Sequence, residues 1–215
     1  PNGAGKSTTI KMLTGILTPT EGVLEVDGMV PWRDRRKYTR RIGVVFGQRS
    51  QLWWDLPLRE SFDILAAIHR LEPRRAATRV GQLIELLDLG PTLAQPVRSL
   101  SLGQRMRAEV AAALLHEPEL IILDEPTIGL DVLSKARLRE FLIAQRGEHG
   151  TTLVLPTHDM GDIERLCARV LVVDDEPSTV DVARAHLEAD LAEVVGAADG
   201  AAAIALSAAK RAKRP

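Results

Sequence analysis

The chain opens with Pro1-Asn2-Gly3-Ala4-Gly5-Lys6-Ser7-Thr8-Thr9, a stretch that predicts a phosphate-binding loop leading directly into a helix. Glycines here allow consecutive backbone N–H groups to close around phosphate oxygens without interference from a Cβ atom. In the pattern G-x-x-x-x-G-K-[ST], Lys6 is expected to reach the β- and γ-phosphates, and Ser7 to offer its hydroxyl to Mg²⁺. The competing interpretation is a glycine-rich turn with an incidental lysine.

A helix is predicted from Thr8 to Leu17, because Ile10, Leu13 and Leu17 follow helical spacing. Its N-terminus would face the anion held by the loop. The first glycine of the pattern would precede Pro1, and so would the strand that normally carries such a loop. We therefore expect the N-terminal strands to be missing, and we expect this chain to bind nucleotide weakly.

Composition narrows the class of protein. The 215 residues are 45% hydrophobic, enough for a large core, and the formal net charge of -1 argues against a surface built to hold nucleic acid. The single cysteine, Cys167, excludes an internal disulfide and fits a reducing compartment. No apolar run approaches the ~18 residues that span a bilayer. We therefore expect a soluble chain whose membrane role, if any, comes through a partner.

The next stretches predict a sheet interrupted by helices. Residues 23–28 alternate like a half-buried strand that ends in a turn. The basic run from Arg33 to Arg41 suggests a solvated helix face, with lipid, partner or nucleic acid contact as the alternatives. Residues 42–46 suggest a buried strand that delivers Gln48 onto the following loop. Two helices then follow between Leu58 and Leu89, separated by Pro73. They indicate an inserted helical subdomain over residues 50–116, approximately.

A second anion site is suggested by the Ser101–Gln104 element, which precedes a helix predicted from Met106 to His116. Ser101 has the chemistry of an N-cap, and together with Gly103 it leaves several N–H groups free at a helix start. An ordinary capped helix is the alternative.

Two adjacent carboxylates follow the continuous apolar run of residues 120–123, which is typical of a strand covered on both faces. Ligands bind at the carboxyl ends of strands in open parallel sheets. We therefore expect Asp124 to bind Mg²⁺ and Glu125 to orient the attacking water or accept its proton. The alternative is a solvated strand end.

Asp131 precedes a helix predicted from Val132 to Arg146, and the strand predicted over residues 151–155 presents His158 at its end. His158 can donate to a γ-phosphate oxygen if it lies beside the loop. The remaining histidines are expected to have surface or packing roles: His69, His116, His149 and His186.

The order of these parts resembles the ATP-binding subunits of ABC transporters over residues 1–173. The strings "IGVVFGQRSQLWWDLP" and "LDEPTIGLD" are most similar to the subfamily that pairs with export-type permeases. The resemblance implies an α/β P-loop NTPase fold, a mostly parallel sheet with an inserted helical subdomain. It also implies an ATPase on the cytoplasmic side, peripheral at the inner face of the membrane and bound to membrane-spanning permease subunits.

The same resemblance assigns roles to residues. ATP and Mg²⁺ would be bound by the positions Asn2, Gly3, Ala4, Gly5, Lys6, Ser7 and Thr8, with Ser7, Gln48 and Asp124 at the metal. Ser101, Gly103 and Gln104 would face ATP held by a second ATP-binding domain in a head-to-tail dimer, and Asp131 would contact that partner. Glu125 would activate water and His158 would steady the γ-phosphate. The permease would dock near Trp53 and Trp54.

Some positions depart from the family pattern. Leu102 stands where the family most often has glycine, Pro156 removes a backbone donor near His158, and the aromatic residue that stacks on adenine is absent.

The tail, residues 170–215, resembles the start of a response-regulator receiver domain: a strand ending in Asp174-Asp175, then helix, strand and helix. Residues 170–173 could be the last strand of the ATPase or the first of the receiver. Because no strand carrying a phosphoryl-accepting aspartate follows, we do not expect phosphotransfer by this tail.

Three functions therefore compete. The leading hypothesis is ATP hydrolysis that powers solute export. A second is a non-transport ABC ATPase, although the zinc element, coiled-coil insertion or second cassette typical of those proteins is not in this sequence. A third is a vestigial ATP site in a signalling or interaction module that acts through its receiver-like tail.

Overall fold

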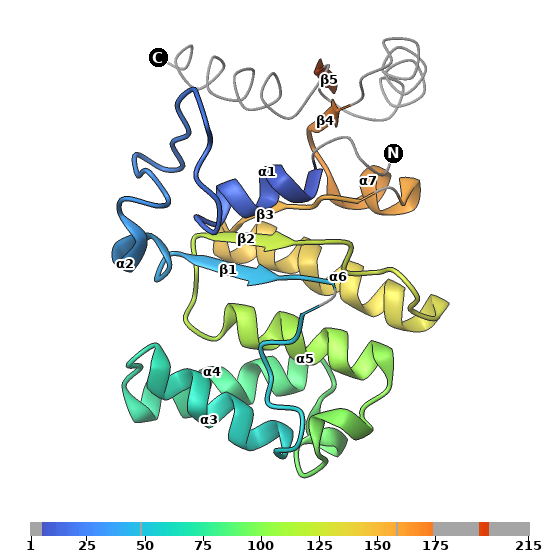
Figure 1. Cartoon of the computed structure of the whole chain (residues 1–215). Helices are drawn as coiled ribbons and strands as arrows, with labels where there is room; N and C mark the ends of the chain where they lie inside the picture. The colour runs from blue at the N-terminus through green and yellow to red at the C-terminus, as the bar shows by residue number, and fades with distance from the viewer. Residues whose placement is uncertain (1–5, 48, 158, 174–193, 198–215) are drawn as a thin grey trace. The chain divides into compact units, whose positions relative to one another are not determined.

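The structure is a computed structural model that describes residues 6–47, 49–157, 159–173 and 194–197. The chain divides into two compact units, residues 1–39 with 158–215, and residues 40–157 (Figure 1). None of the helices in the described ranges has the length and apolar character that crossing a bilayer requires.

The unit of residues 40–157 contains a three-stranded parallel sheet in the order β1-β2-β3. Its strands are β1 (Ile42–Val45), β2 (Leu120–Leu123) and β3 (Thr152–Val154). The register pairs Val45 with Leu123 and Ile122 with Val154. The predicted parallel sheet is thereby confirmed, and its strands all end at the same edge.

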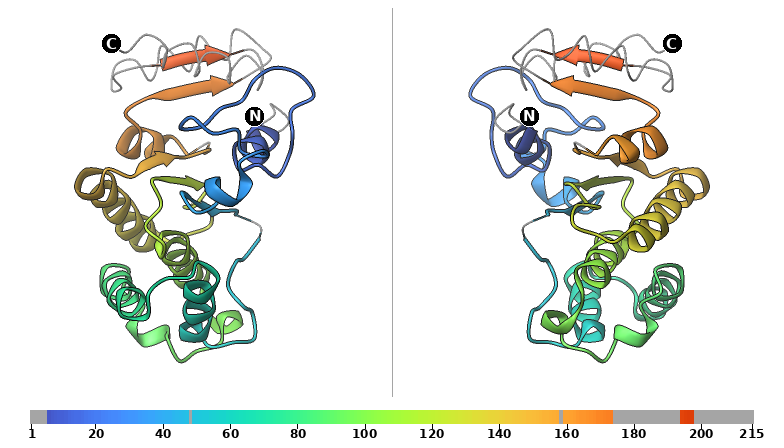
Figure 2. Two further views of the ribbon diagram at one scale, coloured as in Figure 1. Left: turned by 90° about the vertical axis from the view of Figure 1, so that its left-hand side faces the viewer. Right: turned by 90° about the vertical axis from the view of Figure 1, so that its right-hand side faces the viewer.

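Four α-helices complete this unit: α3 (Leu58–Ile68), α4 (Pro73–Leu86), α5 (Leu102–Leu114) and α6 (Val132–His149). Short 3₁₀ turns at Gly90–Thr92 and Val97–Ser99 join α4 to α5. The two helices predicted between Leu58 and Leu89 are present: α3 and α4 contact each other and α5, whereas α5 also contacts β1 and α6 (Figure 2). Helix α5 therefore connects the helical insertion to the sheet.

The close packing of α5 on β1 requires a glycine in the strand. A Cβ atom on Gly43 would lie 2.3 Å from the carbonyl oxygen of Ala113 in α5. The core of this unit includes residues of β1, β2, α5 and α6 that are at most 2% exposed, among them Val45, Ala108, Val110, Ala111, Ile121, Ile122, Leu123, Leu138 and Leu142. Small residues on α5 bring the helix close to the sheet.

In the other unit, α1 (Lys6–Leu13) is shorter than predicted. Gly15 adopts a φ of +71°, and the N–H groups of Ile16 and Leu17 both turn back to the carbonyl of Lys11. Such a left-handed glycine ends a helix by satisfying its last carbonyls. The prediction that the helix continues to Leu17 was wrong, and Leu17 is exposed.

The strand predicted over residues 23–28 was also wrong. Val26 and Met29 exchange both backbone hydrogen bonds, at 2.9 and 3.0 Å, around Asp27 and Gly28. Both central residues have positive φ, 50° and 72°. This is the geometry of a tight type I′ turn, which the Asp-Gly pair favours over continued extension.

The basic run forms the short helix α2 (Arg35–Tyr38), and residues 33–37 are exposed, as predicted for a solvated face. Two of its side chains tie α2 to the end of α1. The Tyr38 hydroxyl donates to the carbonyl of Leu13 at 2.6 Å, and Arg35 donates to the carbonyl of Gly15 at 3.3 Å. Burial raises the pKa of Tyr38 to about 12.

The remaining elements of this unit are α7 (Met160–Leu166), β4 (Val170–Val173) and β5 (Val194–Ala197). Strand β4 pairs in parallel with β5, with Val170 opposite Val194, in a separate two-stranded sheet. Residues 170–173 thus pair with the predicted tail strand and not with β1–β3. Asp174, Asp175 and the two predicted tail helices lie outside the described residues.

Candidate functional site

Asp124 and Glu125 lie at the carboxyl edge of the sheet, as predicted, directly after β2 and half-buried. The backbone N–H of Asp124 donates to the carbonyl of Val45 at 2.9 Å, which extends the pairing of β1 with β2. The N–H of Glu125 donates to the carbonyl of Pro156 at 3.0 Å. Pro156 lacks a donor but serves here as the acceptor that holds Glu125.

The backbone of Glu125 is in the left-handed region, with a φ of +50°. This conformation is costly for a residue with a Cβ atom, and it persists only where the surroundings impose it. The following turn imposes it: Ile128 donates back to the carbonyl of Glu125 at 3.2 Å, and Gly129 has a φ of +70°. The backbone of Glu125 is therefore held by hydrogen bonds at both its N–H and its carbonyl group.

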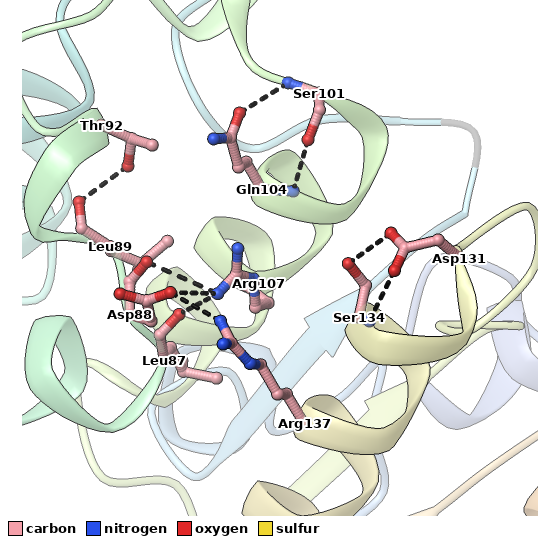
Figure 3. A network of polar contacts seen from close by, with 10 residues as sticks. All are labelled: Leu87, Asp88, Leu89, Thr92, Ser101, Gln104, Arg107, Asp131, Ser134 and Arg137. Atoms are coloured by element: carbon pink, nitrogen blue, oxygen red, sulfur yellow. Dashed lines mark hydrogen bonds and ion pairs between the residues drawn. The ribbon is translucent and has the colours of Figure 1, made fainter.

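Ser101 caps α5 through a complete capping box (Figure 3). Its Oγ accepts from the N–H of Gln104 at 3.2 Å, and the Oε1 of Gln104 accepts from the N–H of Ser101 at 2.9 Å. The predicted N-cap is confirmed, and Ser101 remains exposed. Its hydroxyl keeps acceptor and donor capacity for a ligand.

Gly103 and Asp131 lie next to each other at the starts of α5 and α6. A Cβ atom on Gly103 would lie 2.6 Å from the Oγ of Ser134 and 3.7 Å from the Oδ2 of Asp131. Asp131 caps α6: its Oδ1 accepts from the N–H of Ser134 at 2.9 Å, and its Oδ2 accepts from the Ser134 hydroxyl at 2.6 Å (Figure 3). These bonds, the hydroxyl foremost, lower the pKa of Asp131, so its carboxylate is charged near neutral pH.

Leu102, the departure from the family pattern, covers Gly129. Its Cδ2 is 2.9 Å from the position that a Cβ atom on Gly129 would take. Leu102 is 41% exposed, and exposed apolar side chains follow on the neighbouring loop and the start of α6, namely Ile128, Val132 and Leu133. An apolar surface thus adjoins the Ser101–Gln104 element.

In the other unit, Ser7 and Thr8 lie exposed in the first turn of α1. The positions Asn2, Gly3, Ala4 and Gly5, the side chain of Lys6, and the residues Gln48 and His158 lie outside the described residues. Within residues 40–157 the structure brings the Ser101–Gln104 element together with Asp131, and it places Asp124 and Glu125 on the sheet edge.

Both predicted docking tryptophans reach solvent: Trp53 is 36% and Trp54 is 48% exposed. The guanidinium of Arg105 lies 5.3 Å from the centre of the Trp54 ring, in cation–π range. Neither tryptophan is a core residue, so both are available to a partner.

Sequence reasoning missed two residues. Ser134 is the donor that fills the space beside Gly103. Glu109 is a carboxylate buried on α5, between Ala108 and Val110. The signal in the sequence was a charge at the second position of the otherwise apolar run of residues 108–115.

Comparison with known proteins identifies the family of this chain. The family profile described as ABC transporter matches residues 1–128. The chain belongs to the ABC transporter family.

Among relatives of this ABC cassette, the daunorubicin resistance ATP-binding protein DrrA3 of Streptomyces coeruleorubidus is 36% identical over 199 residues, 91% of this chain. The linearmycin resistance ATP-binding protein LnrL of Bacillus subtilis is 34% identical over 174 residues, 81% of this chain. The cassette spans only 62% and 55% of the lengths of these two relatives.

Solved structures resemble the ABC cassette as well. An ATP-binding subunit of an ABC transporter superposes with a TM-score of 0.69 at 30% identity, covering 78% of this chain and 69% of that one. A dimeric ATP-binding cassette in a post-hydrolysis state with ADP and phosphate superposes with a TM-score of 0.67 at 28% identity, covering 76% and 74%. The P-loop ATPase fold expected from the sequence is confirmed.

Proposed function

We propose that this chain is the ATP-binding and ATP-hydrolysing subunit of a transporter that exports a solute through a membrane permease. The observation that carries the proposal is the sheet edge, where Asp124 and Glu125 directly follow β2 and the backbone of Glu125 is held in the left-handed region. Membership of the ABC transporter family indicates that the nucleotide is ATP. The similarity to ATP-binding proteins of drug resistance favours export over import.

Magnesium suits the residues that we assign to it. Mg²⁺ prefers oxygen ligands and keeps several waters, so it is held by one or two carboxylates together with substrate phosphates. The half-buried Asp124 and the exposed hydroxyl of Ser7 offer such oxygens, and Gln48 would be the third protein ligand. Among the described residues no group of three His, Cys, Asp or Glu side chains could form a dedicated metal cage. Bound Mg²⁺ would neutralise charge on the β- and γ-phosphates.

Hydrolysis would proceed by in-line attack of water on the γ-phosphate. Glu125 would hold the water by accepting a hydrogen bond and then its proton, since the hydrogen bond to Pro156 fixes its backbone. Lys6 and the loop positions Asn2, Gly3, Ala4, Gly5 and Thr8 would bind the phosphates. His158 would donate a hydrogen bond to a γ-phosphate oxygen.

The second ATP-binding domain would face the Ser101–Gln104 element. The exposed Ser101 hydroxyl and the start of α5 at Gly103 form a surface for the γ-phosphate of the partner's nucleotide, and Asp131 would contact the partner domain. The similarity to solved cassettes that are dimeric supports a dimer of this chain. The permease would contact Trp53 and Trp54, and we assign the chain to the cytoplasmic side of the membrane.

A second candidate function rests on the tail. The parallel β4–β5 pair is what a β-α-β start of a receiver domain would produce. In that case the ATP site would be vestigial and the tail would serve signalling. A non-transport ABC ATPase is the third candidate, and no observation in the structure favours it.

Turnover of Mg-ATP by the full chain, measured beside Glu125→Gln, separates an ATP-hydrolysing subunit from a signalling module with a vestigial ATP site. We expect Glu125→Gln to lower turnover by roughly 10²-fold or more, because the variant cannot accept the proton, while nucleotide affinity stays within about twofold. A wild-type chain that binds no nucleotide and shows no turnover would contradict the proposal and favour the signalling function.

A further inference from the structure

Glu109 is a buried carboxylate that the proposed mechanism does not use. It lies in the middle of α5 with 5% of its surface exposed. Its carboxylate accepts from the hydroxyl of Ser50 and from the backbone N–H of Gln51, the latter at 3.2 Å. The side-chain amide of Gln51 donates in return to the carbonyl of Glu109 at 3.1 Å. Three hydrogen bonds therefore join α5 to residues 50–51.

The segment held by Glu109 begins at the sheet edge. After β1, a Cβ atom on Gly47 would lie 3.1 Å from the carbonyl oxygen of Asp124, and Arg49 donates to the carbonyl of Phe46 at 3.2 Å. The Ser50 hydroxyl, besides donating to Glu109, accepts from the N–H of Leu52 at 3.1 Å. The described residues before and after Gln48 thus lie close to the backbone of Asp124 at one end and are hydrogen-bonded to α5 at the other.

Packing alone does not account for a carboxylate at this position. The neighbouring positions of α5 are filled by alanine and valine, and a buried carboxylate loses hydration that an apolar side chain would not. This burial raises the pKa of Glu109, even though the bonds from Ser50 and Gln51 favour its charged form. The hydrogen bonds to residues 50–51 are the gain that offsets the cost.

We propose that Glu109 is a positioning residue for the magnesium side of the site: it anchors the backbone that follows Gln48 to the helix that carries Ser101 and Gly103. Glu109 touches neither nucleotide nor metal and acts through Ser50 and Gln51. The proposal rests on the proposed function, because it assigns Gln48 to Mg²⁺.

The test uses the full chain with Glu109→Ala, Glu109→Gln and Ser50→Ala. The matched control is Arg107→Met. Arg107 is also buried in α5, at 7% exposure, but it donates to the carbonyl of Leu87 at the end of α4 and not to residues 50–51 (Figure 3). Two quantities are measured: the Mg²⁺ concentration that half-saturates turnover, and the affinity for ATP with and without Mg²⁺.

For Glu109→Ala we expect the half-saturating Mg²⁺ concentration to rise by about tenfold, because residues that hold a metal ligand in place affect metal affinity to this extent. The affinity for ATP measured without Mg²⁺ should stay within about twofold of wild type. Glu109→Gln keeps one acceptor oxygen and should fall between wild type and Glu109→Ala. Arg107→Met should leave the Mg²⁺ dependence unchanged. If Glu109→Ala does not fold, Ser50→Ala carries the test, because it removes one hydroxyl from an exposed residue.

A purely structural role would speed amide hydrogen exchange at residues 50–52 without moving the Mg²⁺ dependence, and that result would overturn the proposal. Failure of the hydrolysis proposal is distinguishable. A chain that binds Mg-ATP without turnover refutes hydrolysis, yet the Mg²⁺-dependent gain in ATP affinity still tests Glu109. A chain that binds no nucleotide overturns both.

Discussion

Gly103 illustrates how single atoms decide the surface that would face a second subunit. Its Cβ position is occupied by the Ser134 hydroxyl, which is itself held by Asp131. A side chain at residue 103 would displace the Ser134 hydroxyl and, with it, Asp131. The single change would therefore disturb two predicted site residues, Gly103 and Asp131. The glycine is therefore required by close approach of α6, and not by its own backbone angles, since it is absent from the positive-φ glycines of the described chain.

Gly103→Ala should lower the free energy of unfolding by about 1–3 kcal/mol, because the new Cβ atom would lie 2.6 Å from the Oγ of Ser134. The control is Gly81→Ala in α4, where no atom lies within 4 Å of the new Cβ. That substitution should stabilise the helix by about 0.5–1 kcal/mol. Urea unfolding measures both, and equal tolerance of the two substitutions would refute the steric argument.

Among the elements, α5 combines the most roles. Its first turn holds the capping box, its middle holds Glu109, and its small residues pack on β1. The cap stabilises α5 whether or not a nucleotide is bound. A substitution at Ser101 can therefore change both the stability of the helix and the proposed contact with the γ-phosphate. Different substitutions at Ser101 can separate the two effects.

Ser101→Asp retains a side-chain acceptor for the N–H of Gln104, so its unfolding free energy should stay close to wild type, whereas Ser101→Ala should lose about 1 kcal/mol. The aspartate would repel a γ-phosphate, so Ser101→Asp should lower turnover more than Ser101→Ala does. Urea unfolding and Mg-ATP turnover are measured on both variants. Full turnover in Ser101→Asp would show that Ser101 is only a cap.

At the scale of the whole molecule, the unit of residues 40–157 is held together by contacts between its helical insertion and its sheet. His69 at the end of α3 stacks on His116 after α5, with ring centres 3.9 Å apart, and the Nε2 of His116 lies 2.9 Å from the carbonyl oxygen of Ile42 in β1. The packing role predicted for these two histidines is confirmed. Burial, then the neighbouring His69, lowers the pKa of His116 from 6.5 to about 4.

The sign of the pH dependence follows from this lowered pKa. Below pH 6.5 the unfolded chain binds a proton at His116 that the folded chain does not bind until about pH 4. Stability should therefore fall as the pH is lowered through this window, by roughly 1–3 kcal/mol. His116→Gln should lose the part of this dependence that belongs to His116, whereas His69, whose pKa burial also lowers, keeps its own part. Comparing the free energy of unfolding of the two proteins at each pH removes the contribution of Glu109, whose raised pKa acts in the opposite direction. Parallel curves would contradict the assignment.

Local chemistry in the sequence was enough to predict the parallel strands, the helical insertion, the cap at Ser101 and the carboxylates after β2, because strand ends, caps and apolar periodicity depend on neighbours along the chain. The turn at Asp27-Gly28 was predicted, although the strand expected before it did not form. The stop at Gly15 was predictable from the same rules but was outweighed by apolar spacing. The contacts of Gly103 with Ser134 and of Glu109 with Ser50 emerged only from the folded chain. They join residues 31 and 59 positions apart, and no local pattern specifies which distant side chains packing brings together.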